Sequence, residues 1–393
     1  MRVVLTSESY LPYLSGVTVS VDALARGLGA RGHEVLVVAP RPAPGAAVEE
    51  VGSPGPGPRH AWLDSYQLPV VAPAAYRMAW PNPMAAAWQE ARDFRPDVVH
   101  AHSPFVTGVL ARRLSRAVNA PLVFTHHTRF ADYGHYLGPF AGPGGRLTDA
   151  YLRRFWTGCA AIVAPSGGLA EEIRGRLPAS LRGRVHVIPT GVDVAGVRAL
   201  DPVDSRPAAG WPAGCLVIAT LGRLAPEKST VTVLEAVARL PASRLVVIGG
   251  GQEADALQAR ARHADLEGRV EFSGPLPRRE ALARLAGADL FAFASRTETQ
   301  GLVLAEALSA GLPAVAIDGP GVRDSVRDGI DGRVVRAEPA ATRAERLAAT
   351  LGDLAADPAE RARMARRARD DAGRFAVEAR VAEIEALYRS VLG

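Results

Sequence analysis

The chain has 393 residues, more than one hydrophobic core usually serves, so two domains are expected. Hydrophobic residues make up 48% of the chain and charged residues 22%, and no apolar run approaches the about 20 residues that span a bilayer. Two cysteines offer no metal-binding spacing and suit a reducing compartment. A strand is expected directly from Arg2, without a signal peptide, so the predicted location is cytoplasmic.

The net charge of +5 is unevenly distributed along the chain. Residues 1–190 contain 19 arginines and 13 carboxylates, a net charge of +6, whereas residues 191–393 contain 27 basic and 28 acidic residues. The positive first part favours an anionic partner, but its arginines are scattered rather than clustered, so no nucleic-acid partner is predicted. Lys228 is the only lysine among 46 basic residues, which makes it a candidate functional residue.

The chain opens with a strand, a loop, an amphipathic helix and a second strand. The strands are expected at Val3–Ser7 and Val35–Ala39, and the helix at Ser20–Arg31, where apolar residues recur every three or four positions. This order builds a parallel sheet, in which ligands bind at the carboxyl ends of the strands. Gly16 lies in the loop after the first strand and is therefore a candidate binding residue.

The rest of the first part continues this alternation. Strands are expected at Asp97–Ala101, Pro121–Thr125, Ala160–Ala164 and Val185–Ile188, and helices at Gly108–Val118 and Gly168–Arg176. His126 and His127 follow one strand, and neighbouring residues of a strand point apart, so one should face the core and the other a site, without a shared metal. Residues 129–146 are rich in glycine and aromatic residues, and two interpretations stay open: an ordinary loop, or a mobile lid for a lipid or sugar.

In the second part, a strand at Leu216–Thr220 is followed by Arg223 and Lys228. The two cations are expected to point at one place, which is what a diphosphate requires because both phosphates must be neutralised. The alternative, a solvated helix start, is disfavoured because Lys228 is the only lysine. Further on, Gly249–Ala254 fits the dinucleotide pattern G-x-G-x-x-A, but it follows an internal strand and precedes a polar segment, so the match is weak.

Glu298 and Glu306 stand in a loop that leads into a helix over 302–310, which Gly311 closes. On one continuous helix they would lie about 80° apart, so they can serve one elongated ligand only if Glu298 is in the loop. The backbone N–H groups at this helix start favour an anion. Apolar neighbours predict that Glu306 is partly buried and has a partner; the alternative is two solvated surface charges.

This stretch resembles the E-x7-E motif of the GT4-type retaining glycosyltransferases, which have the GT-B fold, and residues 222–228 are similar to their phosphate motif, G-R-x-x-P-E-K. The resemblance covers nearly the whole chain. It implies an α/β protein with two Rossmann-like domains facing across an interdomain cleft. Residues 1–190 would form the acceptor side and residues 191–374 the nucleotide-sugar side, with a final helix at 375–393 crossing back. The boundary lies within a turn at 189–193 that is similar to the family's P-x-G-V-D.

The resemblance also implies a role for each candidate residue. Glu298 would meet the donor sugar, Glu306 would hold the ribose hydroxyls, and His127 would lie beside the anomeric carbon and the acceptor. Arg223 and Lys228 would stabilise the leaving nucleotide diphosphate. Further contacts with the donor are implied at the glycine loops, the base-binding loop and the helix start: Gly16, Gly250, Leu276, Gly301, Leu302 and Val303. No metal and no organic cofactor are implied, because the nucleotide sugar is a co-substrate.

The implied reaction is retaining transfer of a hexose, from UDP-glucose or UDP-galactose, to an acceptor hydroxyl. The pattern H-H-T…D-Y-G-H-Y, from residue 126 onward, is similar to members that glycosylate membrane lipids, such as diacylglycerol glucosyltransferases. A lipid or sugar acceptor and peripheral attachment to an anionic membrane surface are therefore expected. Three alternatives stay open: a nucleotide-sugar epimerase of the same fold, a non-catalytic nucleotide-sugar-binding protein, and a pyridine-nucleotide oxidoreductase resting on Gly249–Ala254 alone.

Overall fold

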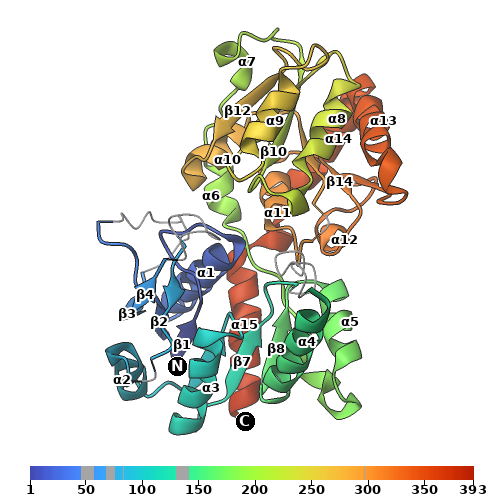
Figure 1. Ribbon diagram of the computed structural model, residues 1–393. Coiled ribbons are helices and arrows are strands. Elements are labelled where there is room, and N and C mark those ends of the chain that lie inside the picture. Colours follow the sequence, from blue (N-terminus) through green and yellow to red (C-terminus); the bar gives the residue numbers. More distant parts are fainter. Residues whose placement is uncertain (46–56, 68–75, 83, 130–140, 296) are drawn as a thin grey trace. The chain divides into compact units, whose positions relative to one another are not determined.

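The computed structural model describes residues 1–45, 57–67, 76–82, 84–129, 141–295 and 297–393 (Figure 1). The chain forms two compact units. The first unit contains residues 1–191 and 377–393, and the second contains residues 192–376. These divisions lie one and two residues from the boundaries that the sequence predicts. None of the helices in the described ranges is both long and apolar enough to cross a bilayer.

The first unit is built on seven parallel strands in the order β3-β2-β1-β6-β7-β8-β9. The strands are β1 (Arg2–Thr6), β2 (Glu34–Pro40), β3 (Arg59–Leu63), β6 (Val98–Ala101), β7 (Leu122–Thr125), β8 (Ala161–Ala164) and β9 (Val185–Val187), and a separate antiparallel pair joins β4 (Ser65–Tyr66) and β5 (Met78–Ala79). The helical elements are α1 (Gly16–Ala30), α2 (Ala86–Asp93), α3 (Val106–Val118), α4 (Ala141–Thr157), α5 (Gly167–Arg176), η2 (Ala179–Arg184) and α15 (Val377–Leu392). The inner strands are buried almost throughout, which explains their continuous apolar runs.

The second unit repeats this plan with six parallel strands in the order β12-β11-β10-β13-β14-β15. The strands are β10 (Leu216–Leu221), β11 (Ser243–Ile248), β12 (Val270–Gly274), β13 (Leu290–Phe293), β14 (Ala314–Ile317) and β15 (Gly332–Val335). The helical elements are α6 (Val194–Arg198), α7 (Ser205–Ala208), η3 (Pro226–Lys228), α8 (Thr230–Ala238), α9 (Ala254–Ala261), α10 (Arg278–Ala286), α11 (Leu302–Ser309), α12 (Val322–Ser325), η4 (Ala340–Thr342), α13 (Arg343–Ala356), α14 (Pro358–Asp370) and η5 (Ala372–Phe375). Each unit is therefore a Rossmann-like sheet with its own core.

Several local predictions are wrong in detail. The first helix begins at Gly16 rather than Ser20, because the Ser15 hydroxyl accepts a hydrogen bond from the backbone N–H of Thr18 (3.2 Å) and caps the helix there. Gly16 is thus a helix residue and not a loop residue. Near the end of the second unit, β15 pairs in parallel with β14, because α12 lies between them in the chain and returns it to the same direction.

The segment between β2 and β6 contains β3, β4, β5 and α2, none of which the sequence predicted. Its mixed polar and aromatic residues lack the apolar runs of the inner strands, as expected at the edge of a sheet. Of the predicted loop or lid at 129–146, residues 130–140 lie outside the described residues. Its last six residues belong to α4, because that helix begins at Ala141.

The final helix, α15, belongs to the first unit. The helices α1 and α15 approach closely, because a Cβ added to Gly27 would lie 2.6 Å from a methyl carbon of Val381. Tyr388 of α15 is fully buried, and its hydroxyl lies 2.6 Å from Nδ1 of His100 on β6. The helix is therefore attached to the sheet by a buried polar contact as well as by apolar packing.

We expect Tyr388→Phe to destabilise the first unit by about 1–3 kcal/mol, because it leaves the buried Nδ1 of His100 without that partner. The free energy of urea unfolding measures the effect. Tyr66→Phe is the matched control, since the Tyr66 hydroxyl contacts the sulfur of Met78, a weak acceptor, at 4.0 Å. An equal loss of stability in both variants would contradict the assignment.

Candidate active site

The second unit has a switch point in its strand order where β10 and β13 pair. From β10 the chain continues to β11 on one side, and from β13 it continues to β14 on the other side. Loops that leave two such strands diverge, and ligands of open α/β sheets bind between them at the carboxyl ends. The loop over 222–229, which includes η3, follows β10, and the loop that contains residues 294, 295 and 297–301 follows β13. The predicted diphosphate and sugar residues lie in these two loops.

The structure brings two predicted residues into direct contact. Nζ of Lys228, at the end of η3, lies 2.5 Å from Oε1 of Glu298. Their side chains are 24% and 17% exposed, so the pair is partly shielded from water. Seventy residues separate the two in the chain, and the pairing of β10 with β13 closes that distance. The contact itself was not predicted from the sequence.

The second predicted cation, Arg223, pairs with a glutamate of its own motif. An NH2 group of Arg223 donates to Oε1 of Glu227 at 2.5 Å. The Glu227 side chain is only 2% exposed, whereas that of Arg223 is 43% exposed. Glu227 belongs to the motif but received no predicted role, although its position four residues after Arg223 is the signal for such a pair. It holds one side of the guanidinium group while the rest stays accessible.

The glycine-rich turn after β11 has a structural explanation within the unit. Gly249 has a φ of +129°, and a Cβ there would lie 2.0 Å from the carbonyl oxygen of Gly222. A Cβ on Gly251 would lie 2.3 Å from the carbonyl oxygen of Leu224, whose N–H bonds to Gly250. These glycines allow the turn to pack against the loop that carries Arg223. Packing within the unit therefore explains the glycines of the weak G-x-G-x-x-A match, without a bound dinucleotide.

Gly250 lies beside Pro275, the residue that precedes Leu276, at the next strand end. A Cβ on Gly250 would lie 3.2 Å from the ring of Pro275, in the loop after β12, and Leu276 is half-buried beside it in sequence. This places the predicted glycine turn next to the predicted base-binding loop. The absence of a side chain at Gly250 is what permits this close approach.

Glu306 lies on α11 with its side chain 5% exposed and forms an ion pair with Arg278 on α10. The prediction of a buried carboxylate with a partner is confirmed. The sequence did not identify Arg278, because the contact depends on how α10 and α11 pack. Gly301, with a φ of +75°, precedes the helix, and Leu302 and Val303 form its first turn. Glu298 is in the loop and Glu306 in the helix, as an elongated ligand would require.

In the first unit, two histidines from neighbouring strand ends meet. Nδ1 of His102, after β6, lies 2.8 Å from Nε2 of His127, after β7, and the rings stack with centroids 5.1 Å apart. His126 instead packs edge-on against Phe124 and Trp156. One histidine of the adjacent pair therefore faces the core, as predicted, and the other contacts His102, which the sequence analysis missed. No group of three or more His, Cys, Asp or Glu residues in the described ranges is arranged to hold a metal ion.

Burial determines the charge of this cluster. It lowers the pKa of His100 and of His126 to about 3, that of His127 to about 4, and that of His102 well below its usual value. All four rings are therefore neutral near pH 7. Gly16, the remaining predicted residue of this unit, is exposed at the start of α1, and a Cβ there would meet no atom within 4 Å. Its own chain gives no steric reason for a glycine.

These lowered pKa values predict that the first unit loses stability as the pH falls. An unfolded histidine titrates near a pKa of about 6.5, so the unfolded chain binds more protons than the folded one below that pH. The free energy of unfolding therefore has its full value above about pH 6.5. It declines as the pH falls toward the pKa of the folded state, which is about 4 for His127. Urea unfolding at pH 7.5 and pH 5.5 should show the loss, and His126→Phe should make it smaller. An equal loss in that variant would contradict the prediction.

Comparison with known proteins gives both units the same kind of match. Residues 14–195 match the model of Glycosyltransferase Family 4, and residues 204–371 match that of Glycosyl transferases group 1. The GDP-mannose-dependent alpha-mannosyltransferase of Mycolicibacterium smegmatis is 30% identical over 83% of this chain and 82% of its own. The alpha-monoglucosyldiacylglycerol synthase of Streptococcus pneumoniae is 26% identical over 86% of this chain and 76% of its own.

The solved structure of Anabaena HepE in complex with UDP and glucose has the same fold, with a TM-score of 0.73 and 19% identity over 99% of this chain and 100% of that one. These findings give the epimerase alternative no support, and they identify an enzyme rather than a binding module. The predicted fold class and enzyme class are confirmed: the chain belongs to the GT4 family of glycosyltransferases and has the GT-B fold.

Proposed function

We propose that this glycosyltransferase moves a hexose from a nucleotide diphosphate sugar to an acceptor hydroxyl, with retention of the anomeric configuration. One observation carries the proposal: Lys228 and Glu298 meet at 2.5 Å where β10 and β13 end side by side. The diphosphate and the attached sugar are adjacent groups of one ligand. Their partners on the protein, a cation for the diphosphate and a carboxylate for the sugar, must therefore be adjacent as well. The switch point of the sheet supplies them.

The ion pairs of the site are compatible with phosphate binding. A lysine ammonium carries three N–H donors and an arginine guanidinium carries five, so each can hold a carboxylate and a phosphate oxygen at the same time. In this proposal Lys228 binds the diphosphate while it orients Glu298 toward the sugar hydroxyls. Arg223, held on one side by Glu227, binds the diphosphate through its accessible side. Glu306, fixed by Arg278, accepts hydrogen bonds from the ribose hydroxyls.

The proposed chemical step takes place on one face of the sugar. The bond between the anomeric carbon and the diphosphate oxygen breaks, and the bond to the acceptor oxygen forms on the same side. The acceptor proton passes to the departing phosphate oxygen, whose negative charge Arg223 and Lys228 stabilise. His127 hydrogen-bonds the donor sugar as a neutral imidazole. Because these two cations and the helix start meet the charge of the leaving group, we propose that no metal or organic cofactor takes part.

For the donor we propose UDP-glucose or UDP-galactose. The glucosyl group is supported by the relative named alpha-monoglucosyldiacylglycerol synthase, which matches 86% of the chain. GDP-mannose is the second candidate, because the mannosyltransferase relative is the more identical of the two, at 30%. Both bases would meet the loop that contains Leu276, so the choice between them is a matter for the first experiment.

For the acceptor we propose a membrane lipid such as diacylglycerol, reached from the cytoplasmic membrane surface. The net charge of +6 on residues 1–190 favours anionic headgroups. In α4, Leu147 is 73% exposed between arginines at 146 and 153, and Trp80 is 57% exposed near the β4–β5 pair. Exposed apolar and aromatic side chains among cations are typical of surfaces that bind a lipid interface.

The donor and acceptor are tested together by product analysis. The protein is incubated with UDP-glucose, UDP-galactose or GDP-mannose, and with diacylglycerol in vesicles that contain anionic lipid, and the products are identified by mass spectrometry. We expect a hexosyl-diacylglycerol from one of the UDP sugars. A product from GDP-mannose alone would overturn the proposed donor, and transfer to soluble sugars without any lipid product would overturn the proposed acceptor.

The site is tested by Lys228→Met and Glu298→Gln. Each should lower kcat/KM by about 100-fold to 1000-fold, the usual cost of losing a group that stabilises the transition state. The matched controls are Arg363→Met and Glu360→Gln, which break an ion pair of 2.7 Å on α14, in the same unit but away from β10 and β13. Near-wild-type activity in the first pair, or an equal loss in the controls, would contradict the assigned site.

A further inference from the structure

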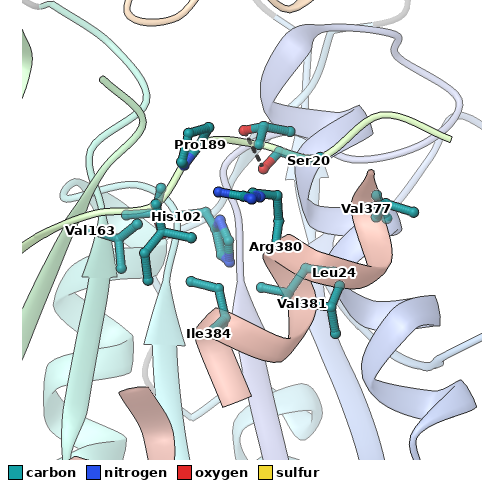
Figure 2. A pocket seen from close by; sticks show the side chains of 14 residues that line it. Ser20, Leu24, His102, Val163, Pro189, Val377, Arg380, Val381 and Ile384 are labelled. Carbon is teal, nitrogen blue, oxygen red and sulfur yellow. Dashed lines mark hydrogen bonds between the residues drawn. The ribbon is translucent and has the colours of Figure 1, made fainter. Parts of the chain in front are cut away.

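A pocket in the first unit is lined in part by His102 of the histidine pair, whereas His127 is not among its lining residues (Figure 2). It is lined by α1, by the ends of β7 and β8, by residues just beyond β6 and β9, and by α15. Its polar lining includes Ser20, Thr190, His102 and Arg380. The hydroxyls of Ser20 and Thr190 lie 3.2 Å apart and hydrogen-bond to one another. No part of the proposed donor site uses this pocket.

Two buried nitrogens of the lining lack a hydrogen-bond partner among the described residues: Nε2 of His102 and Nε of Arg380. His102 is only 4% exposed. The outer end of the Arg380 side chain is held by Glu383, at 2.9 Å, and the side chain is 23% exposed. Figure 2 shows the guanidinium group of Arg380 and the ring of His102 facing the same space. The pocket therefore holds a cationic hydrogen-bond donor and the unpartnered Nε2 of His102.

The chemistry of the two groups constrains their protons. A guanidinium nitrogen only donates hydrogen bonds, whereas Nε2 of a neutral histidine donates in one tautomer and accepts in the other. In a buried space lined by the donor Arg380, the tautomer of His102 that accepts at Nε2 is favoured. The single ring proton of His102 is then on Nδ1. That nitrogen is the one that lies 2.8 Å from Nε2 of His127.

We propose that His102 is a positioning residue for the transfer reaction: its Nδ1–H donates to Nε2 of His127 and fixes His127 as the tautomer protonated on Nδ1, while Arg380 selects that arrangement from the pocket. The inference rests on the proposed function, in which His127 hydrogen-bonds the donor sugar. A neutral imidazole whose Nε2 accepts a hydrogen bond has its single N–H at Nδ1. The tautomer therefore decides which atom of His127 donates.

The ring of His102 is held by its surroundings as well as by this bond. The ring of His100 lies against it, with centroids 4.2 Å apart. His100 is itself fixed at both nitrogens, by the Tyr388 hydroxyl at 2.6 Å and by the Thr125 hydroxyl at 2.7 Å. A chain of contacts thus runs from α15 through His100 and His102 to His127. Since burial lowers the pKa of all three rings and keeps them neutral, the proton positions are set by partners and not by charge.

The direct test is nitrogen-15 NMR of histidine-labelled protein near pH 7, with the signals of His127 assigned from their loss in His127→Gln. In the wild type we expect His127 protonated on Nδ1 and unprotonated on Nε2. In His102→Leu we expect a mixture of both tautomers, and Arg380→Met should move the population in the same direction. A wild-type His127 protonated on Nε2, or a His127 tautomer unchanged in His102→Leu, would overturn the proposal.

The kinetic test compares two substitutions of the same residue. His102→Leu should lower kcat by about 10-fold to 100-fold, the usual effect of losing an orienting partner, with the donor KM within about twofold. His102→Asn keeps an amide N–H near the place of Nδ1 and should recover most of the lost kcat. Equal losses in both variants would mean that only packing matters, which overturns the proposal.

His186→Leu is the matched control, because His186 is a half-buried histidine of β9 outside the pocket, and it should leave kcat unchanged. A loss there equal to that of His102→Leu would also count against the proposal. The proposed function and the proposed role of His102 can be refuted by different results. A wild-type protein without transferase activity would refute the proposed function, whereas the NMR result decides the tautomer with no substrate present.

Discussion

The parallel pairing of β10 with β13 is the constraint on which the proposed donor site depends. Ile218 and Ala219 pair with Leu290 and Phe291, so the two strands end together although about 70 residues separate them in the chain. The loop that leaves β10 must therefore lie near the loop that leaves β13. The charged residues need only stand at the correct distance after each strand, because the backbone of the sheet brings them together. The same constraint in the first unit, through β6 and β7, brings His102 to His127.

The charged residues of the proposed donor site already form ion pairs within the protein. Arg223, Lys228 and Arg278 each contact a glutamate, and the glutamate side chains are 2%, 17% and 5% exposed. Pairs of this kind restrict the rotamers of long side chains, so less conformational entropy is lost when a diphosphate binds. They also limit the net positive charge of the site. Binding must then draw on hydrogen-bond geometry and on the backbone N–H groups at the start of α11 as well as on net charge.

The sequence predicted those elements that have a recognisable local pattern of residues. Inner strands are continuous apolar runs because both of their faces are buried, and the candidate residues come directly after those runs. The edge strand β3 was not predicted, because it mixes polar and apolar residues and so lacks a continuous apolar run. The contacts Arg278–Glu306 and His102–His127 were not predicted for another reason. Each joins residues of separate elements, 28 and 25 positions apart. A partner of this kind depends on helix packing and strand order, which no local pattern records.

The two units differ in the kind of polar group that they contribute. The second unit presents ion pairs, whereas the first presents imidazoles whose pKa is lowered by burial, to about 4 for His127, and the difference suits the proposed reaction. Positive charge develops at the anomeric carbon in the transition state of glycosyl transfer, and an imidazolium there would repel it. A neutral His127 can hydrogen-bond the sugar without that penalty. Burial of the histidine cluster costs stability in acid, but it keeps His127 uncharged near pH 7, which is the state that the proposed reaction requires of it.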